Sequence, residues 1–305
     1  MLLIKFAFVC VIYQVFACRI IYNIVFCAYL IINKMRTIKA LASAFFILIT
    51  ATTAFAQDTK IWNNKQCAVV LTYDDAIDVD IDNVAPALDS LNLKGTFYLI
   101  GSSPVIEKRL PEWRKIAASG HELGNHGLFH PCDGSQPGRS FVKPDHDLSK
   151  YSVVRAVDEI RVYNTFLKAI DGKDKRTYAY PCGDLTINGV PFYKDLEKDF
   201  AGARGVTAGT QGANEVDLSN IDSYMINGQS AEYMIDLIKK AQQSHKLIVF
   251  LFHGVGGGHN INVSLDAHSK LLHYLKNNEK DIWVAPMVDV AEKITAYQKT
   301  NPKKM

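Results

Sequence analysis

The chain has 305 residues, 48% of them hydrophobic and 21% charged, with a formal net charge of +3 at neutral pH. This charge includes the basic residues of an apolar N-terminal region, so the rest of the chain is close to neutral, and it carries no long basic run, which argues against nucleic acid as a partner. About 250 residues remain beyond that region, enough for one large α/β domain with a sizeable core.

The N-terminal region contains two apolar stretches. Residues 35–56 have a basic start, an apolar centre and an Ala-Phe-Ala cleavage site at 54–56, which is the layout of a secretory signal peptide. We therefore interpret residues 1–34 as an upstream extension of the reading frame, with a double-spanning membrane anchor as the alternative. The mature chain, 57–305, is expected to be secreted or periplasmic, with no stable membrane anchor after signal cleavage.

The first element of the mature chain is a buried strand that ends in two carboxylates. Residues 68–76, AVVLTYDDA, form an apolar run that stops at Asp74 and Asp75. In α/β folds the chemistry gathers where such strands end. Adjacent side chains at a strand end diverge, so one carboxylate can hold a metal ion while the other moves a proton. A loop start or a helix cap is the alternative.

Strands and helices then alternate along the chain. Apolar spacing predicts helices at 83–91, 109–119, 152–170, 192–199, 231–244, 265–277 and 288–297, and strands at 93–100, 122–123, 175–181, 202–208, 246–253 and 282–286. This alternation predicts a single α/β domain built as a distorted (β/α) barrel of about seven parallel strands. The stretch 210–214 is expected to be a loop.

The segment 120–131, GHELGNHGLFHP, contains two histidines four residues apart. One helical turn would put His126 and His130 on the same face, a spacing that suits nitrogen ligands of a divalent metal. Together with Asp75 they make a set of two histidines and one carboxylate that leaves positions open for water and substrate. Two surface histidines are the alternative. In the loop 131–147, Phe141 and His146 are candidates for substrate contacts.

Two more polar positions follow later strands. The strand 246–253 ends at His253, a candidate general acid or base, and the glycine-rich loop after it carries His259, which either reaches the site or lies on the surface. The turn Pro181-Cys182-Gly183 can present backbone N–H groups to an oxyanion, although ordinary turn chemistry also explains it.

The order and spacing of these segments resemble the polysaccharide deacetylases, also called NodB-type carbohydrate esterases. The family's T-F-D-D-G, H-(S/T)-x-x-H, R-P-P-Y-G and L-x-H motifs resemble four stretches of this sequence, which are 72–76, 126–130, 179–183 and 251–253. The resemblance spans residues 66 to 295. It implies that Asp74 is the base and His253 the acid.

For the metal, the resemblance implies the ligands Asp75, His126 and His130, with zinc as the usual ion; cobalt, nickel or manganese also suit these ligands. It places the oxyanion at the backbone N–H of Cys182, and the groove at Tyr180 and Pro181. His259 is a further candidate for substrate binding.

The sequence also departs from the family pattern. Gly127 stands where a Ser or Thr is usual, and Ala76 where Gly is usual. Ala179 stands where many members carry an arginine that pairs with the catalytic base, so another group would have to take over that role. The carboxylate partner of the acid is also unassigned, with Asp222 as a candidate.

The resemblance implies a metal-dependent hydrolase that removes N- or O-acetyl groups from an acetylated polysaccharide or oligosaccharide, of the chitin, peptidoglycan or acetylxylan type. Two alternatives stay open. One is an amidohydrolase of the same fold that acts on a small non-sugar amide. The other is a sugar-binding module that has lost catalysis, which Ala179 suggests.

The three cysteines of the mature chain are Cys67, Cys132 and Cys182. An odd number argues against a disulfide framework in an exported protein, so free thiols are the prediction. Cys132 and Cys182 both flank proposed site motifs, and a single bridge between them is the alternative.

Overall fold

The computed structural model describes residues 60–302. The predicted upstream extension (1–34) and signal peptide (35–56) lie outside this range. Within it, none of the helices combines the length and the apolar character needed to cross a membrane.

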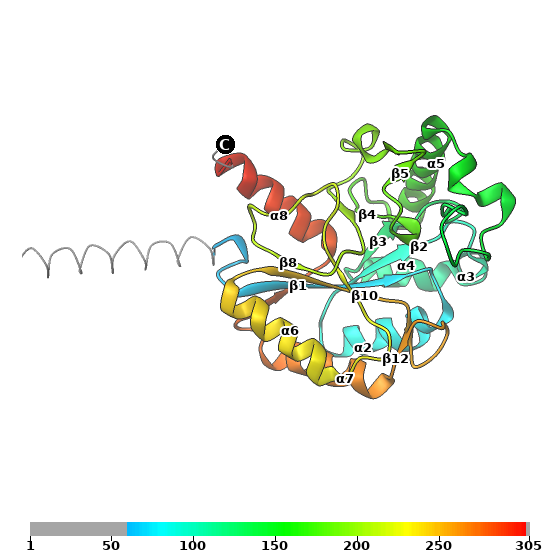
Figure 1. Cartoon of the computed structure of the whole chain (residues 1–305). Helices are drawn as coiled ribbons and strands as arrows, with labels where there is room; N and C mark the ends of the chain where they lie inside the picture. The colour runs from blue at the N-terminus through cyan, green and yellow to red at the C-terminus, as the bar shows by residue number, and fades with distance from the viewer. Residues whose placement is uncertain (1–59, 303–305) are drawn as a thin grey trace, which may run out of the picture. The chain divides into compact units, whose positions relative to one another are not determined.

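The architecture is a mixed sheet with helices on both faces (Figure 1). All strand pairs of this sheet are parallel except β10 with β8. The predicted single α/β domain with a distorted barrel is confirmed. In spatial order the strands are β7 (Ala203–Arg204), β4 (Tyr178–Ala179), β3 (Glu122–Asn125), β2 (Thr96–Leu99), β1 (Cys67–Asp74), β10 (Leu247–Phe252) and β8 (Thr210–Gln211), with β13 (Ile282–Val284) on β1 and β9 (Tyr224–Met225) on β10.

Strand β1 lies inside the sheet, and both of its faces are buried. Its residues 67, 69, 71 and 73 belong to one apolar cluster, with side chains of α2 (Ala85–Ser90), α6 (Ala231–Ser244) and α7 (Leu265–Asn277). Ala68 and Val70 belong to another, with side chains of α8 (Met287–Thr300). In Figure 1, α6 and α7 accordingly lie on the opposite side of β1 from α8. Alternate residues of a strand point to opposite faces, so a continuous apolar run is what a doubly covered strand requires.

Most predicted helices are confirmed, some with slightly shifted ends. Those not yet introduced are α4 (Leu110–Ala118) and α5 (Val153–Asp171). The structure adds a short helix, α3 (Pro104–Lys108), and the helix expected from residue 83 begins as a π-helical turn, Asp80–Val84, that continues into α2. Helix α5 is capped by the Ser152 side chain at its start and ends at Gly172, which has a φ of 72°. Glycine adopts this left-handed conformation without steric cost, so the helix stops there.

Four predicted elements differ in the structure. The strand at 175–181 is reduced to β4, because Pro181 has no N–H to donate to the sheet. The strand at 202–208 is reduced to β7, after which the Gly205 N–H donates to Ile221 O. The helix at 192–199 is only a 3₁₀ turn, Tyr193–Asp195, because its backbone hydrogen bonds join residues three apart. The loop at 210–214 contains β8, which pairs with β10.

Candidate active site

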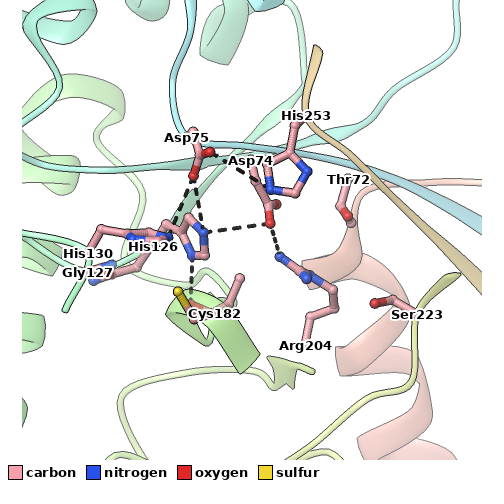
Figure 2. A network of polar contacts seen from close by, with 12 residues as sticks. Thr72, Asp74, Asp75, His126, Gly127, His130, Cys182, Arg204, Ser223 and His253 are labelled. Atoms are coloured by element: carbon pink, nitrogen blue, oxygen red, sulfur yellow. Dashed lines mark hydrogen bonds and ion pairs between the residues drawn. The ribbon is translucent and has the colours of Figure 1, made fainter. Parts of the chain in front are cut away.

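The polar residues selected from the sequence meet at the carboxyl ends of the parallel strands. Asp74 ends β1, Asp75 follows it, His126 follows β3 and His253 follows β10. Figure 2 shows these side chains converging on one another, with His130 beside them. Neighbouring parallel strands end at the same edge of a sheet, so segments far apart in the chain supply one site.

Three of these side chains form a group with the geometry of a metal site. The Asp75 Oδ1 atom lies 3.6 Å from His126 Nε2 and 3.7 Å from His130 Nε2. All three ligand atoms lie within 4.8 Å of one another. Asp75 Oδ1 is buried and has no hydrogen-bond partner within residues 60–302. Buried carboxylate oxygens are normally paired or bound to a metal, so the donor set fits a divalent cation.

A backbone contact orients the first histidine. His126 Nδ1 donates to Ala179 O at 2.9 Å, which leaves Nε2 free to face the carboxylates. Metal-binding histidines commonly use such a contact to fix the tautomer and the ring orientation. This link joins the end of β3 to the end of β4.

The predicted helical turn between the two histidines is wrong. Residues 126–130 form a loop in which Gly127 has a φ of 79° and His130 a φ of 51°. The loop still brings the two rings to 4.7 Å between centroids. A left-handed φ favours glycine over side chains with a Cβ, and Gly127 adopts it without steric cost.

Burial sets the protonation states of these ligands. It lowers the pKa of His126 to about 3 and that of His130 to about 4. Both imidazoles are therefore neutral at pH 7, the form that binds metal ions. Burial and the adjacent Asp74 raise the pKa of Asp75, because two carboxylates side by side repel each other. A cation in this group would relieve the repulsion.

The other carboxylate has a cationic partner that the sequence reasoning missed. Asp74, 2% exposed, accepts a hydrogen bond through Oδ2 from Arg204, a fully buried residue at the end of β7. Burial alone would raise the pKa of Asp74, but Arg204 together with His126 and His253 outweighs it and holds the pKa below its usual value. The sequence signal was a lone arginine inside the apolar stretch predicted as a strand at 202–208.

Two histidines lie on the other side of Asp75. The Nε2 atoms of His253 and His259 each lie 3.8 Å from Asp75 Oδ2. Their rings are stacked, with centroids 4.7 Å apart. The structure thus places His259 in the site rather than among surface histidines. Burial lowers the pKa of His253.

The expected carboxylate partner of His253 is not found in the described part of the chain. The buried His253 Nδ1 has no hydrogen-bond partner there. Asp222 instead lies against Gly209, where a Cβ would come 2.4 Å from Asp222 Oδ2. Asp222 therefore does not fill the role for which it was considered.

The third motif is held by a disulfide. Cys132 and Cys182 are bonded, with their Cα atoms 5.7 Å apart, so the prediction of free thiols is wrong for this pair, and Cys67 stays a buried free thiol. The loop after His130 and the turn after β4 lie face to face at the same edge of the sheet, which allows the bond. Cys182 has a φ of 56° within its turn, and its carbonyl accepts a hydrogen bond from Arg139.

Tyr180 and Pro181 are not exposed as expected for groove residues. Tyr180 is 3% exposed, its ring packs against Tyr178 and Phe192, and its hydroxyl donates to Ser219 O at 2.7 Å. Pro181 is also buried. Their substrate-binding role stays a prediction that these positions do not favour.

An open cavity of about 470 Å³ lies beside the site. Asp75, His130 and His259 line it together with an aromatic group on the loop 131–147 and next to it. In this group Phe129 stacks on His146 at 4.9 Å, and Phe141 is 64% exposed. The cavity is large enough for a sugar ring to reach the polar group.

Comparison with known proteins gives a family and a similar fold. Residues 63–200 match the family model described as polysaccharide deacetylase. Over 204 residues the chain is 25% identical to a gellan lyase of Bacillus sp; the match covers 62% of this chain and only 7% of that protein.

Two solved structures are similar to this chain, and the first of them shares its fold. Puue allantoinase has a TM-score of 0.52 at 12% identity, and the match covers 79% of this chain and 93% of that chain. The Xyl-CE4 domain of a multidomain xylanase from the hindgut metagenome of Trinervitermes trinervoides has a TM-score of 0.49 at 19% identity, with 74% and 90% covered.

Proposed function

We propose that this chain is a metal-dependent hydrolase of the polysaccharide deacetylase family, whose model matches residues 63–200, and that it removes N- or O-acetyl groups from an acetylated polysaccharide or oligosaccharide. The observation that carries the proposal is the group of Asp75, His126 and His130, together with Asp74 and His253 next to it. Two carboxylates and three histidines at one edge of the sheet, beside an open cavity, have a clear use in metal-assisted hydrolysis.

Asp75, His126 and His130 would hold the divalent ion, and zinc suits two neutral imidazoles with one carboxylate. Cobalt, nickel or manganese would also be accepted by this ligand set. When bound, the ion supplies Lewis-acid polarisation of the acetyl carbonyl and acidification of water.

Asp74 would act as the general base. Its Oδ2 atom is engaged by Arg204, whereas Oδ1 is buried and has no hydrogen-bond partner in the described residues. The Oδ1 atom is therefore free to take a proton from an attacking water.

His253 would protonate the leaving amine or alcohol. Because burial lowers its pKa, its imidazolium is a stronger proton donor than an exposed one. The backbone N–H of Cys182, in the turn that the disulfide ties to the loop after His130, would stabilise the oxyanion. Acetate and a free sugar amine or hydroxyl result.

The test is acetate release by the purified protein, after chelation and again after zinc or cobalt is added. Substrates are acetylated xylan, chitin oligomers, peptidoglycan and allantoin, a small non-sugar amide that is assayed by its own hydrolysis. Asp74→Asn and His126→Ala are expected to lower kcat by about 100-fold or more. His273→Ala, at an exposed histidine of α7, is the matched control and should retain full activity.

The outcomes separate the readings. Metal-dependent acetate release that both variants lose supports the proposal. Hydrolysis of allantoin without acetate release would favour the small-amide reading. Zinc binding with no turnover of any substrate would refute the enzyme and favour a sugar-binding module.

We further propose that the protein is exported. The support is the signal-peptide pattern at 35–56. N-terminal sequencing of the protein recovered from the producing cells should find a start at residue 57, and a retained N-terminus at residue 1 or 35 would contradict this.

A further inference from the structure

Arg204 of β7 lies next to Ala179 of β4, the position at which the resembled motif has an arginine. Ala179 of β4 and Arg204 of β7 are direct register partners in a parallel pair. Side chains at paired positions of adjacent strands point to the same face of the sheet, roughly 5 Å apart. An arginine at 204 therefore serves the same volume that one at 179 would serve.

Both residues lie in the interior of the protein. Ala179 and Arg204 are each fully buried. The Ala179 carbonyl accepts the hydrogen bond from His126 Nδ1. The Arg204 guanidinium lies 5.1 Å from the centre of the Tyr98 ring, so this ring restricts where the guanidinium can lie.

Arg204 has one charged partner. Within residues 60–302 its sole ion pair is with Asp74, and its Nε atom has no hydrogen-bond partner. Its Nη1 atom makes a long contact of 3.4 Å with Gly205 O. A buried cation is strongly unfavourable unless it is paired, so this arginine is explained by Asp74 rather than by packing.

We propose that Arg204 is the positioning residue of Asp74. It supplies from β7 the guanidinium that the resembled motif supplies from the position of Ala179 on β4. The proposal rests on the role of Asp74 as the base. By engaging Oδ2, which also lies 3.6 Å from His126 Nε2, Arg204 fixes the carboxylate rotamer and leaves Oδ1 without a hydrogen-bond partner in the described residues. Figure 2 shows Arg204 approaching Asp74 from the side away from Asp75.

The experiment measures kcat, KM and zinc affinity for four variants. Arg204→Met removes the cation, Arg204→Lys keeps a charge, and Arg204→Ala combined with Ala179→Arg moves the guanidinium to β4. Arg176→Met is the matched control, because Arg176 is a second buried arginine paired with a carboxylate, Asp171, outside the site.

Arg204→Met is expected to lower kcat by about 100-fold, the loss typical of a misplaced catalytic group. KM and zinc affinity should stay within about threefold, since Arg204 is fully buried and its hydrogen bonds go to Asp74 and to Gly205 O. Arg204→Lys should keep an intermediate kcat, because an ammonium cannot reproduce the planar contact. The relocated arginine should regain at least tenfold over Arg204→Met, and Arg176→Met should lose stability but not kcat.

A folded, zinc-binding Arg204→Met protein with kcat within threefold of wild type would overturn the proposal. So would a folded double variant no faster than Arg204→Met. If Arg204→Met does not fold, Arg204→Lys and the double variant decide in the same way. An inactive wild-type protein would instead refute the proposed function, which keeps the two failures apart.

Discussion

The disulfide between Cys132 and Cys182 closes a loop with a sequence separation of 50 residues. In the chain-entropy model, closing a loop of this length in the unfolded chain stabilises the folded protein by about 4 kcal/mol. For a domain of this size each kcal/mol corresponds to about 2–4 °C in Tm. Reduction, or replacement of both cysteines by serine, should therefore lower Tm by about 8–16 °C.

The assay is thermal unfolding followed by circular dichroism, with and without a phosphine reductant, on wild type and on the double serine variant. Wild type should respond to the reductant and the double variant should not. Cys67→Ala is the control, because burial raises the pKa of the Cys67 thiol to about 12 and removes it from thiol chemistry. A wild-type Tm that changes by less than 2 °C on complete reduction would refute the reasoning.

The same bond should affect the metal group. Cys132 Sγ lies 3.6 Å from Nδ1 of His130, one of the proposed metal ligands, so releasing the loop should loosen that ring. We expect zinc affinity to fall by about tenfold in the double serine variant, as for other lost supports of a ligand. Competition with a chromophoric chelator measures it, and unchanged affinity would show that the bond stabilises the fold alone.

Three further predictions concern pH, substrate and metal. Burial lowers the pKa of His268 from 6.5 to about 4; its unfolded pKa is the higher one, so stability is complete above pH 6.5 and falls as the pH drops toward 4. Urea unfolding should show a loss of about 2 kcal/mol from this group between pH 7 and pH 5, and His268→Asn should remove it; identical pH slopes in both proteins would contradict this. Phe141→Ala should raise KM for acetylated oligosaccharides by about 2–10-fold through lost stacking and leave turnover of 4-nitrophenyl acetate unchanged; an equal loss on both would place Phe141 outside sugar binding. Zinc at about 100 times its Kd should stabilise the wild type by about 2.7 kcal/mol but not His126→Ala; equal stabilisation of both would put the metal elsewhere.

The residues at strand ends were predictable because local pattern and position coincide there. An apolar run that stops at a carboxylate or a histidine marks the edge of a parallel sheet, and Asp74, Asp75 and His253 lie at that edge. His126 and His130 were paired for a partly wrong reason. Their spacing suggested a helical turn, whereas a loop with left-handed residues brings the rings together.

The contacts that were missed depend on tertiary register. Arg204 is 130 residues from Asp74 in the chain, and nothing local connects them. The odd number of cysteines led to the prediction of free thiols. A count cannot show that Cys67 is buried apart from the other two, which lie close enough to bond. Strands β4 and β7 are shorter than predicted. Pro181 limits β4, and the contact of Gly205 with Ile221 limits β7.

Position 179 illustrates which parts of such a site are free to change. Its carbonyl oxygen orients His126, and that contact belongs to the main chain, so an alanine keeps it as well as an arginine would. The charge that the resembled motif places at this position is a side-chain property and can be supplied from any neighbouring strand that reaches the same volume. Arg204 on the paired strand does so. An electrostatic task can therefore move to a second strand of the sheet, whereas the direct metal contact proposed for Asp75 requires a ligand atom at that position, 3.6 Å from His126 Nε2 and 3.7 Å from His130 Nε2.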